Sequence, residues 1–295
     1  MKEIRKVAVL GGGLMGSGIA QVSAAAGFQT TVREVSEALG TKSRQAIEKS
    51  LAKGIERGKT TLAERDTTLG NLKFATDLKE LADSDIFIEA VVEDLEVKNT
   101  LWGQLDKLAG PDAIFASNTS SLTIIAMAAA SGRADRMLGL HFFNPVPVMK
   151  LVEVVRTITT SEETERRALD FVRALGKEPI RAKDSSGFVV NLLLIPYMLD
   201  AINALESNVA SVEDIDKGMQ LGAGHPMGPF TLLDFVGLDT AYKIAEIMFA
   251  EYRDKRYAPP PLLKRMVLAG MLGKKSGKGF YDYSVTPPRV SPLGL

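Results

Sequence analysis

Short apolar runs rich in β-branched residues alternate with longer amphipathic stretches through the first half of the chain. The runs have the length and composition of buried strands, and they cover residues 6–10, 30–35, 85–92, 113–118, 137–143 and 150–155. Helical patterns lie between most of them. The clearest are a small-residue stretch that ends at Gly27 and a charged stretch over residues 36–57. This alternation predicts an α/β fold with a doubly wound, mainly parallel sheet.

The pattern changes near residues 184–187. Beyond them, helical periodicity continues with almost no strand pattern, at residues 189–207, 212–221 and 232–252. We therefore predict a sheet-containing domain over residues 1–185 and an all-helical domain over residues 186–295. The proline-rich tail from residue 284 is predicted to be an extended or mobile end. The helices of the second domain carry more apolar surface than a domain of this size can bury, so we expect a homodimer formed through it.

Charge and composition narrow the function classes. The 36 basic and 36 acidic side chains balance, which gives no general attraction to nucleic acid or to an anionic membrane. The absence of cysteine excludes disulfides, thiolate metal sites and a cysteine nucleophile, and two histidines argue against a histidine metal site. No apolar run approaches the ~20 residues that span a bilayer, and glycines interrupt the N-terminal apolar run, unlike in a signal peptide. We expect a cytoplasmic enzyme or binding protein without a metal.

The stretch VLGGGLMGSG contains the pattern G-x-G-x-x-G directly after a predicted strand and at the start of a predicted helix. Glycines placed in this way permit a tight turn and let the backbone approach a pyrophosphate, whose charge meets the helix N-terminus. The stretch predicts a Rossmann-type dinucleotide site, with a glycine turn used only for packing as the alternative. The loop and first helical turn of that site are formed by Gly11, Gly13, Leu14, Met15 and Gly16.

An acidic residue belongs about 20 residues further on, at the end of the second strand, and Glu34 stands there. Its carboxylate can accept hydrogen bonds from both hydroxyls of an adenosine ribose, and it would repel a 2′-phosphate. NAD is therefore the expected cofactor. The neighbouring Arg33 keeps NADP open, because a guanidinium turned inward would pair with that phosphate.

One of the two histidines, His141, lies in a strand-like run shortly before a second strand that contains Glu153. Strand alternation places Glu153 on a face with two aliphatic residues, where an ionised carboxylate is costly unless it is paired. The intervening NPVP forces a turn, so the chain can fold back and bring Glu153 to His141. A carboxylate that accepts the Nδ1–H of an imidazole fixes its tautomer and stabilises the imidazolium.

The other ring nitrogen would then take a proton from a substrate hydroxyl, which is the acid–base half of an alcohol dehydrogenase. The nicotinamide would be the hydride half. The alternative is a core histidine satisfied by a backbone carbonyl, with Glu153 paired to Lys150 or to an arginine. The spacing alone leaves both interpretations open.

Seven blocks of the sequence together resemble the (S)-3-hydroxyacyl-CoA dehydrogenase family, and most of all its bacterial 3-hydroxybutyryl-CoA members. They are GGGLMGSGIA, EAVVEDLEVKN, SNTSSL, HFFNPVPVMKLVEV, GFVVNLLLIP, HPMGP and GKKSGKGFYDY. The resemblance implies an NAD(P)-dependent oxidoreductase that interconverts a 3-hydroxyacyl-CoA and a 3-ketoacyl-CoA in a cleft between the two domains. A short acyl chain, 3-hydroxybutyryl or acetoacetyl, is the expected substrate.

The resemblance also implies roles for individual residues. His141 matches the catalytic base and Glu153 its orienting partner. Ser120 matches a serine that hydrogen-bonds the substrate's 3-oxygen, and Asn191 matches an asparagine of the helical domain near the same centre. Residues that match cofactor contacts are Glu93, Lys98, Asn144 and Lys275, and those that match coenzyme A contacts are Ser50, Lys53, Arg57 and Ser120.

Simpler explanations exist for two of these sets. Ser120 would serve as the N-cap of a helix that starts at Leu122, and the basic residues of KSLAKGIERGK would form a solvated helix face.

Two other functions are alternatives to the enzyme. One is a 3-hydroxy acid or sugar-acid dehydrogenase of related fold that does not use coenzyme A, against which the intact HFFNPVPVMK argues. The other is a dinucleotide-binding protein that has lost the chemistry, against which the intact histidine, glutamate, serine and asparagine argue.

Overall fold

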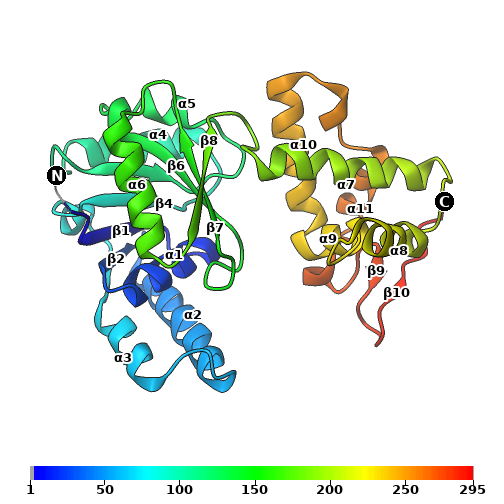
Figure 1. Ribbon diagram of the computed structural model, residues 1–295, viewed down its shortest axis with the longest axis horizontal. Coiled ribbons are helices and arrows are strands. Elements are labelled where there is room, and N and C mark those ends of the chain that lie inside the picture. Colours follow the sequence, from blue (N-terminus) through cyan, green and yellow to red (C-terminus); the bar gives the residue numbers. More distant parts are fainter. Residues whose placement is uncertain (1–2, 295) are drawn as a thin grey trace. The chain divides into compact units, whose positions relative to one another are not determined.

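The computed structural model describes residues 3–294, and the chain folds into two compact units. The first unit ends at Phe188 and the second begins at Val189. Figure 1 shows that the large sheet belongs to the first unit and that the second unit is built mainly of helices. Within the described residues, none of the helices combines the length and the apolar character that crossing a bilayer requires.

The first unit is organised by one sheet, which in the described residues has the strand order β3-β2-β1-β4-β5-β6-β7-β8. Neighbouring strands are parallel except β6 and β7, which are antiparallel, and the predicted doubly wound, mainly parallel sheet is confirmed. Since β1 lies between β2 and β4, the order reverses at β1, where such sheets bind ligands beyond the carboxyl ends of their strands. The strands are β1 (Lys6–Leu10), β2 (Gln29–Arg33), β3 (Leu72–Ala75), β4 (Ile86–Glu89), β5 (Ile114–Ser117), β6 (Met137–Phe142), β7 (Leu151–Arg156) and β8 (Glu178–Lys183).

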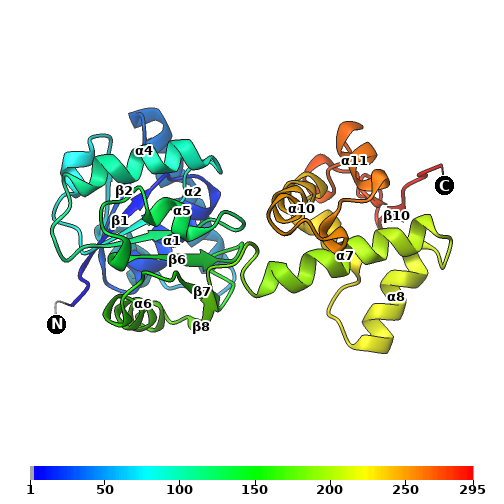
Figure 2. The same ribbon diagram turned by 90° about the horizontal axis from the view of Figure 1, so that it is seen from above.

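Helices cover both faces of this sheet, as the view in Figure 2 makes clear for α4 and α6. Successive residues of β1 point to opposite faces, so Val7 and Val9 pack in one buried cluster and Ala8 and Leu10 in the other. The first cluster includes residues of α1, α2 and α6, and the second includes residues of α4 and α5. These helices are α1 (Leu14–Ala25), α2 (Glu37–Glu56), α4 (Leu95–Asp106), α5 (Ile124–Ala128) and α6 (Glu162–Ala174).

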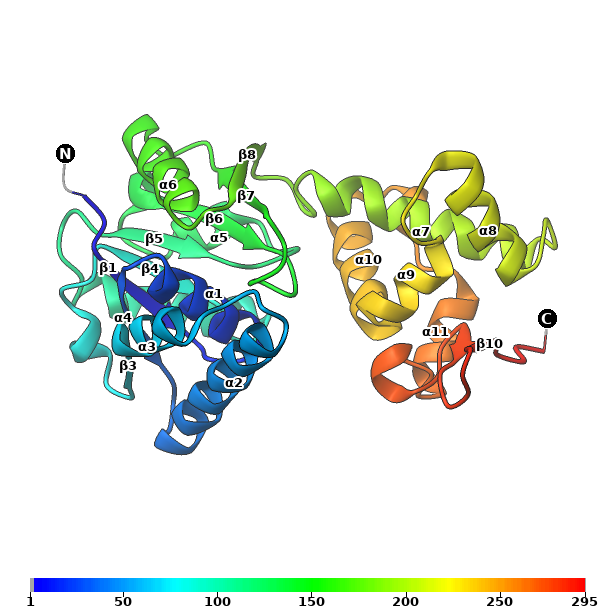
Figure 3. The same ribbon diagram turned by 60° about the horizontal axis from the view of Figure 1, so that its bottom comes forward.

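Helix α2 has the bounds that its sequence predicts. The Ser36 hydroxyl accepts the Leu39 N–H at the start, and the helix ends at Glu56 with Arg57 as its C-cap. A following helix, α3 (Leu62–Gly70), begins at a capping box in which Thr61 and Glu64 exchange hydrogen bonds. Figure 3 shows α2 beside α3, reaching past the strands of the sheet, so much of the charged surface of α2 faces solvent.

The second unit is helical, as predicted, with a small antiparallel ladder added near the end of the chain. Its buried core includes Phe230, Leu233, Leu263 and Phe280. The helices are α7 (Val190–Glu206), α8 (Val212–Ala223), α9 (Pro229–Val236), α10 (Leu238–Tyr252) and α11 (Pro261–Leu268), and the ladder pairs β9 (Tyr281–Asp282) with β10 (Arg289–Val290).

A buried carboxylate attaches the C-terminal segment to the helices of the second unit. Asp234, on α9, accepts the N–H groups of Phe280 and Tyr281 at 2.9 and 2.8 Å. Burial raises the pKa of Asp234, although these hydrogen bonds oppose that shift. Beyond the ladder, the Ser291 N–H donates to the Phe280 carbonyl. The tail is therefore extended, and it is attached to the second unit as far as Ser291.

The structure departs from the predicted elements in two ways. Strands β3 and β8 were not predicted, and both are edge strands whose partial exposure weakens the apolar pattern. The run over residues 85–92 was predicted as one strand, but β4 ends at Glu89. The apolar Val91 and Val92 that follow line a cavity instead of continuing the sheet.

Candidate active site

His141 and Glu153 face each other across the antiparallel pair β6 and β7, where they are register partners. The Nδ1 of His141 lies 2.6 Å from Oε2 of Glu153, and both side chains are buried. The imidazole also packs near the rings of Phe143 and Phe188, at centroid distances of 4.5 and 5.5 Å. Of the two arrangements that the sequence left open, the structure has the one in which Nδ1 meets a carboxylate. Nδ1 is then the donor, which leaves Nε2 as the atom that can accept a proton.

The loop that carries Ser120 is fixed from both sides. On one side, Oδ1 of Asn118 accepts the Phe142 N–H at 2.9 Å, which links the end of β5 to the end of β6. On the other, the Thr119 hydroxyl donates to Glu93 and accepts the Leu122 N–H. Ser120 directly follows these two attached residues, after β5, the strand next to that of His141.

The helix after this loop does not begin where the alternative explanation of Ser120 requires. Helix α5 starts at Ile124, and the N–H groups of Ile124 and Ile125 each donate to the carboxylate of Asp184 at 2.7 Å. Asp184, which follows β8, therefore satisfies the first amides of α5 in place of a local cap. The alternative in which Ser120 is the N-cap of a helix that starts at Leu122 is therefore wrong.

Two carboxylates enclose one buried lysine at the ends of β4 and β5. The Nζ of Lys98 lies 2.7 Å from Oε1 of Glu89 and 3.0 Å from Oε2 of Glu93. Ser117 donates to the second oxygen of Glu89 at 2.6 Å, and the Val91 N–H donates to the first at 2.8 Å. Because the polar atoms have partners, this cluster can remain charged inside the unit.

Only one member of this cluster reaches the surface appreciably. The side chain of Glu93 is 24% exposed, whereas those of Lys98 and Glu89 are 1% and 0% exposed. Burial raises the pKa of Glu93, but the charge of Lys98 and the hydrogen bonds from Lys98, Thr119 and the Ser120 N–H outweigh it and lower the pKa below its usual value. A ligand would therefore meet an ionised Glu93, with Lys98 behind it.

Glu89 was not predicted as a site residue. Its pattern in the sequence is the same as that of Glu153, an acidic residue inside an apolar strand, in DIFIEAVV. Both glutamates need a partner because both are buried. The partner of Glu89, however, is Lys98, nine residues away on α4, so no pair of predicted strands indicates it.

The glycine loop has the shape that a dinucleotide requires. A Cβ on Gly11, whose φ is +91°, would lie 2.8 Å from the Ala90 carbonyl oxygen, and one on Gly16 would lie 1.7 Å from the Gly11 carbonyl oxygen. At Gly13 a Cβ would meet nothing within 4 Å, so this residue opens onto free space at the N-terminus of α1. Leu14 is exposed there, and Met15 packs against the core. The backbone can thus approach a phosphate group, and the residues fit a dinucleotide.

A cavity of about 500 Å³ lies on one side of this loop. Oε1 of Glu34 accepts the Gly12 N–H at 2.6 Å, and Arg33 donates from Nε to the Thr76 carbonyl at 3.1 Å. Both predicted determinants of cofactor choice therefore line one cavity together with apolar residues suited to an adenine ring. The lining includes Gly11, Gly13, Arg33, Glu34, Val35, Val92 and Val97.

A second cavity, of about 410 Å³, lies between α1, α2 and the loop that joins β6 to β7. It brings together five predicted residues from four segments, which are Gly13, Leu14, Glu34, Ser50 and Asn144. Lys53 and Arg57 do not line it. They are exposed further along α2, and neither forms an ion pair within residues 3–294.

The two remaining predicted residues belong to the second unit. Asn191 lies in the first turn of α7. Lys275 lies in a short 3₁₀ turn over Lys274–Ser276, and its Nζ is 2.6 Å from Oδ1 of Asp239. Lys275 is half-exposed, so the ion pair leaves part of its head group accessible.

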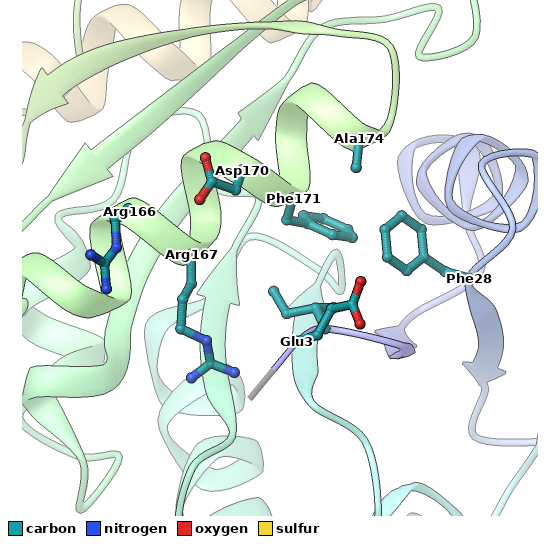
Figure 4. Close-up of a pocket in the computed structure, with 8 residues that line it drawn as sticks. Glu3, Phe28, Arg166, Arg167, Asp170, Phe171 and Ala174 are labelled. Carbon is teal, nitrogen blue, oxygen red and sulfur yellow. The ribbon is translucent and has the colours of Figure 1, made fainter. Parts of the chain in front are cut away.

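Another cavity of the first unit, of about 250 Å³, includes none of the predicted residues in its described lining. Figure 4 shows its charged side chains pointing in different directions, with Arg166, Arg167 and Asp170 turned away from the paired rings of Phe28 and Phe171. The polar groups do not converge on one point. Across residues 3–294, no cluster of three histidine or acidic side chains is placed to hold a metal ion.

Comparison with protein families matches both units. The family described as "3-hydroxyacyl-CoA dehydrogenase, NAD binding domain" matches residues 6–185. The family described as "3-hydroxyacyl-CoA dehydrogenase, C-terminal domain" matches residues 187–283. The two matches together cover nearly the whole chain.

Individual relatives are similar over the same length. A 3-hydroxybutyryl-CoA dehydrogenase of Mycobacterium tuberculosis is 54% identical over 282 residues, which are 95% of this chain and 99% of that protein. The human mitochondrial hydroxyacyl-coenzyme A dehydrogenase is 48% identical over 292 residues, 95% of this chain and 91% of the human one. The crystal structure of (S)-3-hydroxybutyryl-CoA dehydrogenase PaaH1 from Ralstonia eutropha superposes with a TM-score of 0.92 at 42% identity, covering 96% of this chain and all of that one.

The buried cluster of charges predicts a large effect of removing its cation. In a Lys98→Met variant, Glu89 and Glu93 face each other without a counter-charge, and the free energy of unfolding should fall by about 3–5 kcal/mol. Urea denaturation can be followed by the fluorescence of Trp102, the single tryptophan, which is fully buried on the same helix as Lys98. The control is Lys107→Met, at an exposed lysine at the end of α4, and equal stability of the two variants would contradict the prediction.

Proposed function

The chain belongs to the 3-hydroxyacyl-CoA dehydrogenase family, and we propose that it interconverts an (S)-3-hydroxyacyl-CoA and the corresponding 3-ketoacyl-CoA. The names of its relatives favour 3-hydroxybutyryl-CoA and acetoacetyl-CoA as the substrate pair. The observation that carries the proposal is the buried contact of 2.6 Å between His141 and Glu153, in the same unit as a glycine loop that fits a dinucleotide.

The proposed acid–base step uses His141. In the oxidation, Nε2 of His141 removes the proton of the 3-hydroxyl group, and Glu153 orients the ring and balances the charge that it gains. A bound nicotinamide supplies the hydride chemistry at C3, as acceptor in this direction and donor in the other. In the reduction, the protonated His141 returns the proton to the 3-oxygen. A positioned general base of this kind contributes roughly two to four powers of ten to the rate.

Ser120 and Asn191 are proposed to steady the 3-oxygen as negative charge develops on it. A donor is effective in this role when it needs no reorganisation during the reaction. For Ser120, the hydrogen bonds of the preceding Asn118 and Thr119 give the loop such a fixed shape. Asn191 is assigned to the same centre by its match to the family pattern.

The cofactor contacts are proposed from the two cavities beside the glycine loop, which Glu34 and Asn144 line, and from the match of Glu93, Lys98 and Lys275 to the family pattern. Glu34 would accept the ribose hydroxyls, and Glu93, Asn144 and Lys275 would contact the nicotinamide and its ribose, with Lys98 supporting Glu93. NAD is the proposed cofactor, because the carboxylate of Glu34 lines the cavity and would repel a 2′-phosphate. The hydrogen bond from Nε of Arg33 to Thr76 directs that side chain along the neighbouring segment, which also favours NAD.

Coenzyme A is proposed to lie along α2. Ser50 lines the same cavity as Asn144, and Lys53 and Arg57 follow it at helical spacing with exposed charges that form no ion pair among residues 3–294. Such charges suit the 3′-phosphate and the pyrophosphate of the substrate.

The second unit is proposed to form the contact of a homodimer. Among its described residues, large apolar side chains stay exposed in the single chain, including Val209, Leu221 and Leu268 at 72%, 77% and 78%. Burial of such side chains against a second copy would be favourable. A cytoplasmic location is part of the same proposal.

The first experiment measures the oxidation of NADH by acetoacetyl-CoA, followed by the loss of reduced cofactor absorbance. The wild-type protein should turn over, and His141→Ala should lower kcat by roughly 100-fold to 10,000-fold because it removes the proposed base. The matched control is His225→Ala, at the other histidine, which is exposed and lies 3.1 Å from the Tyr197 hydroxyl. Wild-type protein without turnover would refute the proposed substrate, and free 3-hydroxy acids would be tried next.

Cofactor choice is tested by running NADH and NADPH side by side. The wild-type protein should prefer NADH, and Glu34→Gln should shift the ratio of the two kcat/KM values toward NADPH by about tenfold, since about 1.4 kcal/mol of repulsion is removed. The amide keeps the size of the side chain and one acceptor for the ribose. A wild-type preference for NADPH would contradict the proposal.

The coenzyme A contact is tested by a double change, Lys53→Ala and Arg57→Ala. Each exposed charge pair contributes up to about 1 kcal/mol, so the KM for acetoacetyl-CoA should rise by about fivefold to tenfold at low salt and less at high salt. The KM for NADH should stay as it is. Lys79→Ala, at an exposed lysine between β3 and β4, is the control, and an unchanged KM in the double variant would show that these residues form only a solvated face.

A further inference from the structure

Lys177 places an ammonium group inside the first unit. The residue lies between α6 and β8 and is 7% exposed. Its Nζ donates to the backbone carbonyls of Val146 and Met149, each at 2.7 Å. Within residues 3–294 it forms no ion pair, so these two carbonyls hold it without a carboxylate.

Burying a lysine in this place lowers the stability of the fold. Taking a charged group out of water is unfavourable, and burial lowers the pKa of Lys177 for that reason. An apolar side chain of similar length would fill the same space without this cost. Lysine differs from such an apolar residue in donating hydrogen bonds to the two carbonyls. We therefore look for the role of Lys177 in the segment that carries these carbonyls.

That segment is the loop between β6 and β7, which connects the strand of His141 to the strand of Glu153. Its residues Asn144 to Pro147 form one wall of the cavity of about 410 Å³, opposite the glycine loop and Ser50. The loop therefore faces a ligand site on one side and Lys177 on the other.

The other attachments of the loop are few. The buried Val146 packs against α1 so closely that a Cβ on Gly18 would lie 2.8 Å from it. The N–H groups of Val148 and Met149 both donate to the Pro145 carbonyl at 2.9 Å, which is a contact within the loop. The side chains of Val148 and Met149 are 64% and 39% exposed and do not hold the loop in place. The Glu178 N–H of β8 also donates to the Lys150 carbonyl at 2.9 Å, but only where the loop runs into β7. For the part of the loop that lines the cavity, Lys177 is thus the described polar link to another element.

We propose that Lys177 is a positioning residue of the reaction. By holding the carbonyls of Val146 and Met149, it fixes the loop that presents Asn144 to the cofactor and forms the wall of the cavity. It acts through the loop and touches neither substrate nor cofactor. The kinetic part of the inference rests on the proposed function.

The test compares Lys177→Met with Lys183→Met, a matched change at an exposed lysine at the end of β8. With Lys177→Met, the KM for NADH should rise about tenfold while kcat changes less than threefold, because the loop is displaced and the base is intact. Lys177→Arg, which can still donate to both carbonyls, should bring the KM back to within threefold of the wild-type value. Lys183→Met should behave as the wild-type protein does.

Hydrogen exchange measures the same loop without turnover. In Lys177→Met, the amides of Val148 and Met149 should exchange at least tenfold faster than in the wild-type protein and in Lys183→Met. Unchanged exchange would overturn the inference, and so would a lower kcat with an unchanged KM for NADH, which is the result expected of a merely structural lysine. If the wild-type protein does not turn over acetoacetyl-CoA, the proposed function fails, while the exchange result still decides the role of Lys177.

Discussion

The antiparallel pairing of β6 with β7 is the constraint on which the candidate site depends. It is the one reversal among the described strand pairs of a sheet that is otherwise parallel, and its register sets His141 opposite Glu153. Because side chains alternate along a strand, a slip of one residue would turn Glu153 to the other face and leave both groups buried without a partner. The loop between the strands therefore does more than connect them. It packs on α1 and accepts hydrogen bonds from Lys177, so the cavity wall is joined to two further elements of the unit.

The same requirement, that a buried charge must find a partner, organises the neighbouring strands. Glu89 at the end of β4 holds Lys98, Ser117 at the end of β5 donates to Glu89, and the exposed Glu93 is held by Lys98. In each case the partner comes from another element. The contacts that join these elements when the sheet folds therefore also assemble the site. Desolvation makes it unfavourable to bury such groups without partners. It also makes their geometry specific, because few positions give every oxygen and every N–H a hydrogen bond.

The sequence predicted the parts of this arrangement that depend on local pattern. Periodicity located β1 and α2, and alternation with a turn at NPVP offered the contact of Glu153 with His141 as one of two open arrangements. Prediction from the sequence failed where contacts between distant segments determine the structure. The edge strands β3 and β8 bury too little to show a pattern, and the first amides of α5 are capped by Asp184, 60 residues away from Ile124 in sequence. Glu89 and Lys177 were missed because their partners become visible only in the folded chain. The roles of Ser50, Lys53, Arg57 and Lys275 came from resemblance, and no local pattern would have assigned them.

Burial also divides residues that resemblance treats alike. Glu93 and Lys98 both match cofactor contacts, yet Lys98 is enclosed by two carboxylates and Glu93 is the member of that cluster that faces out. A cofactor would therefore meet the charge of the cluster through Glu93, whose ionised form Lys98 stabilises. With two carboxylates and one ammonium, the cluster carries a net charge of −1 when all three groups are ionised. In the proposed binding mode this charge would lie near the nicotinamide. It would favour the oxidised, positively charged ring over the neutral reduced one, and the position of Lys98 would then bear on the balance between the two directions of the reaction.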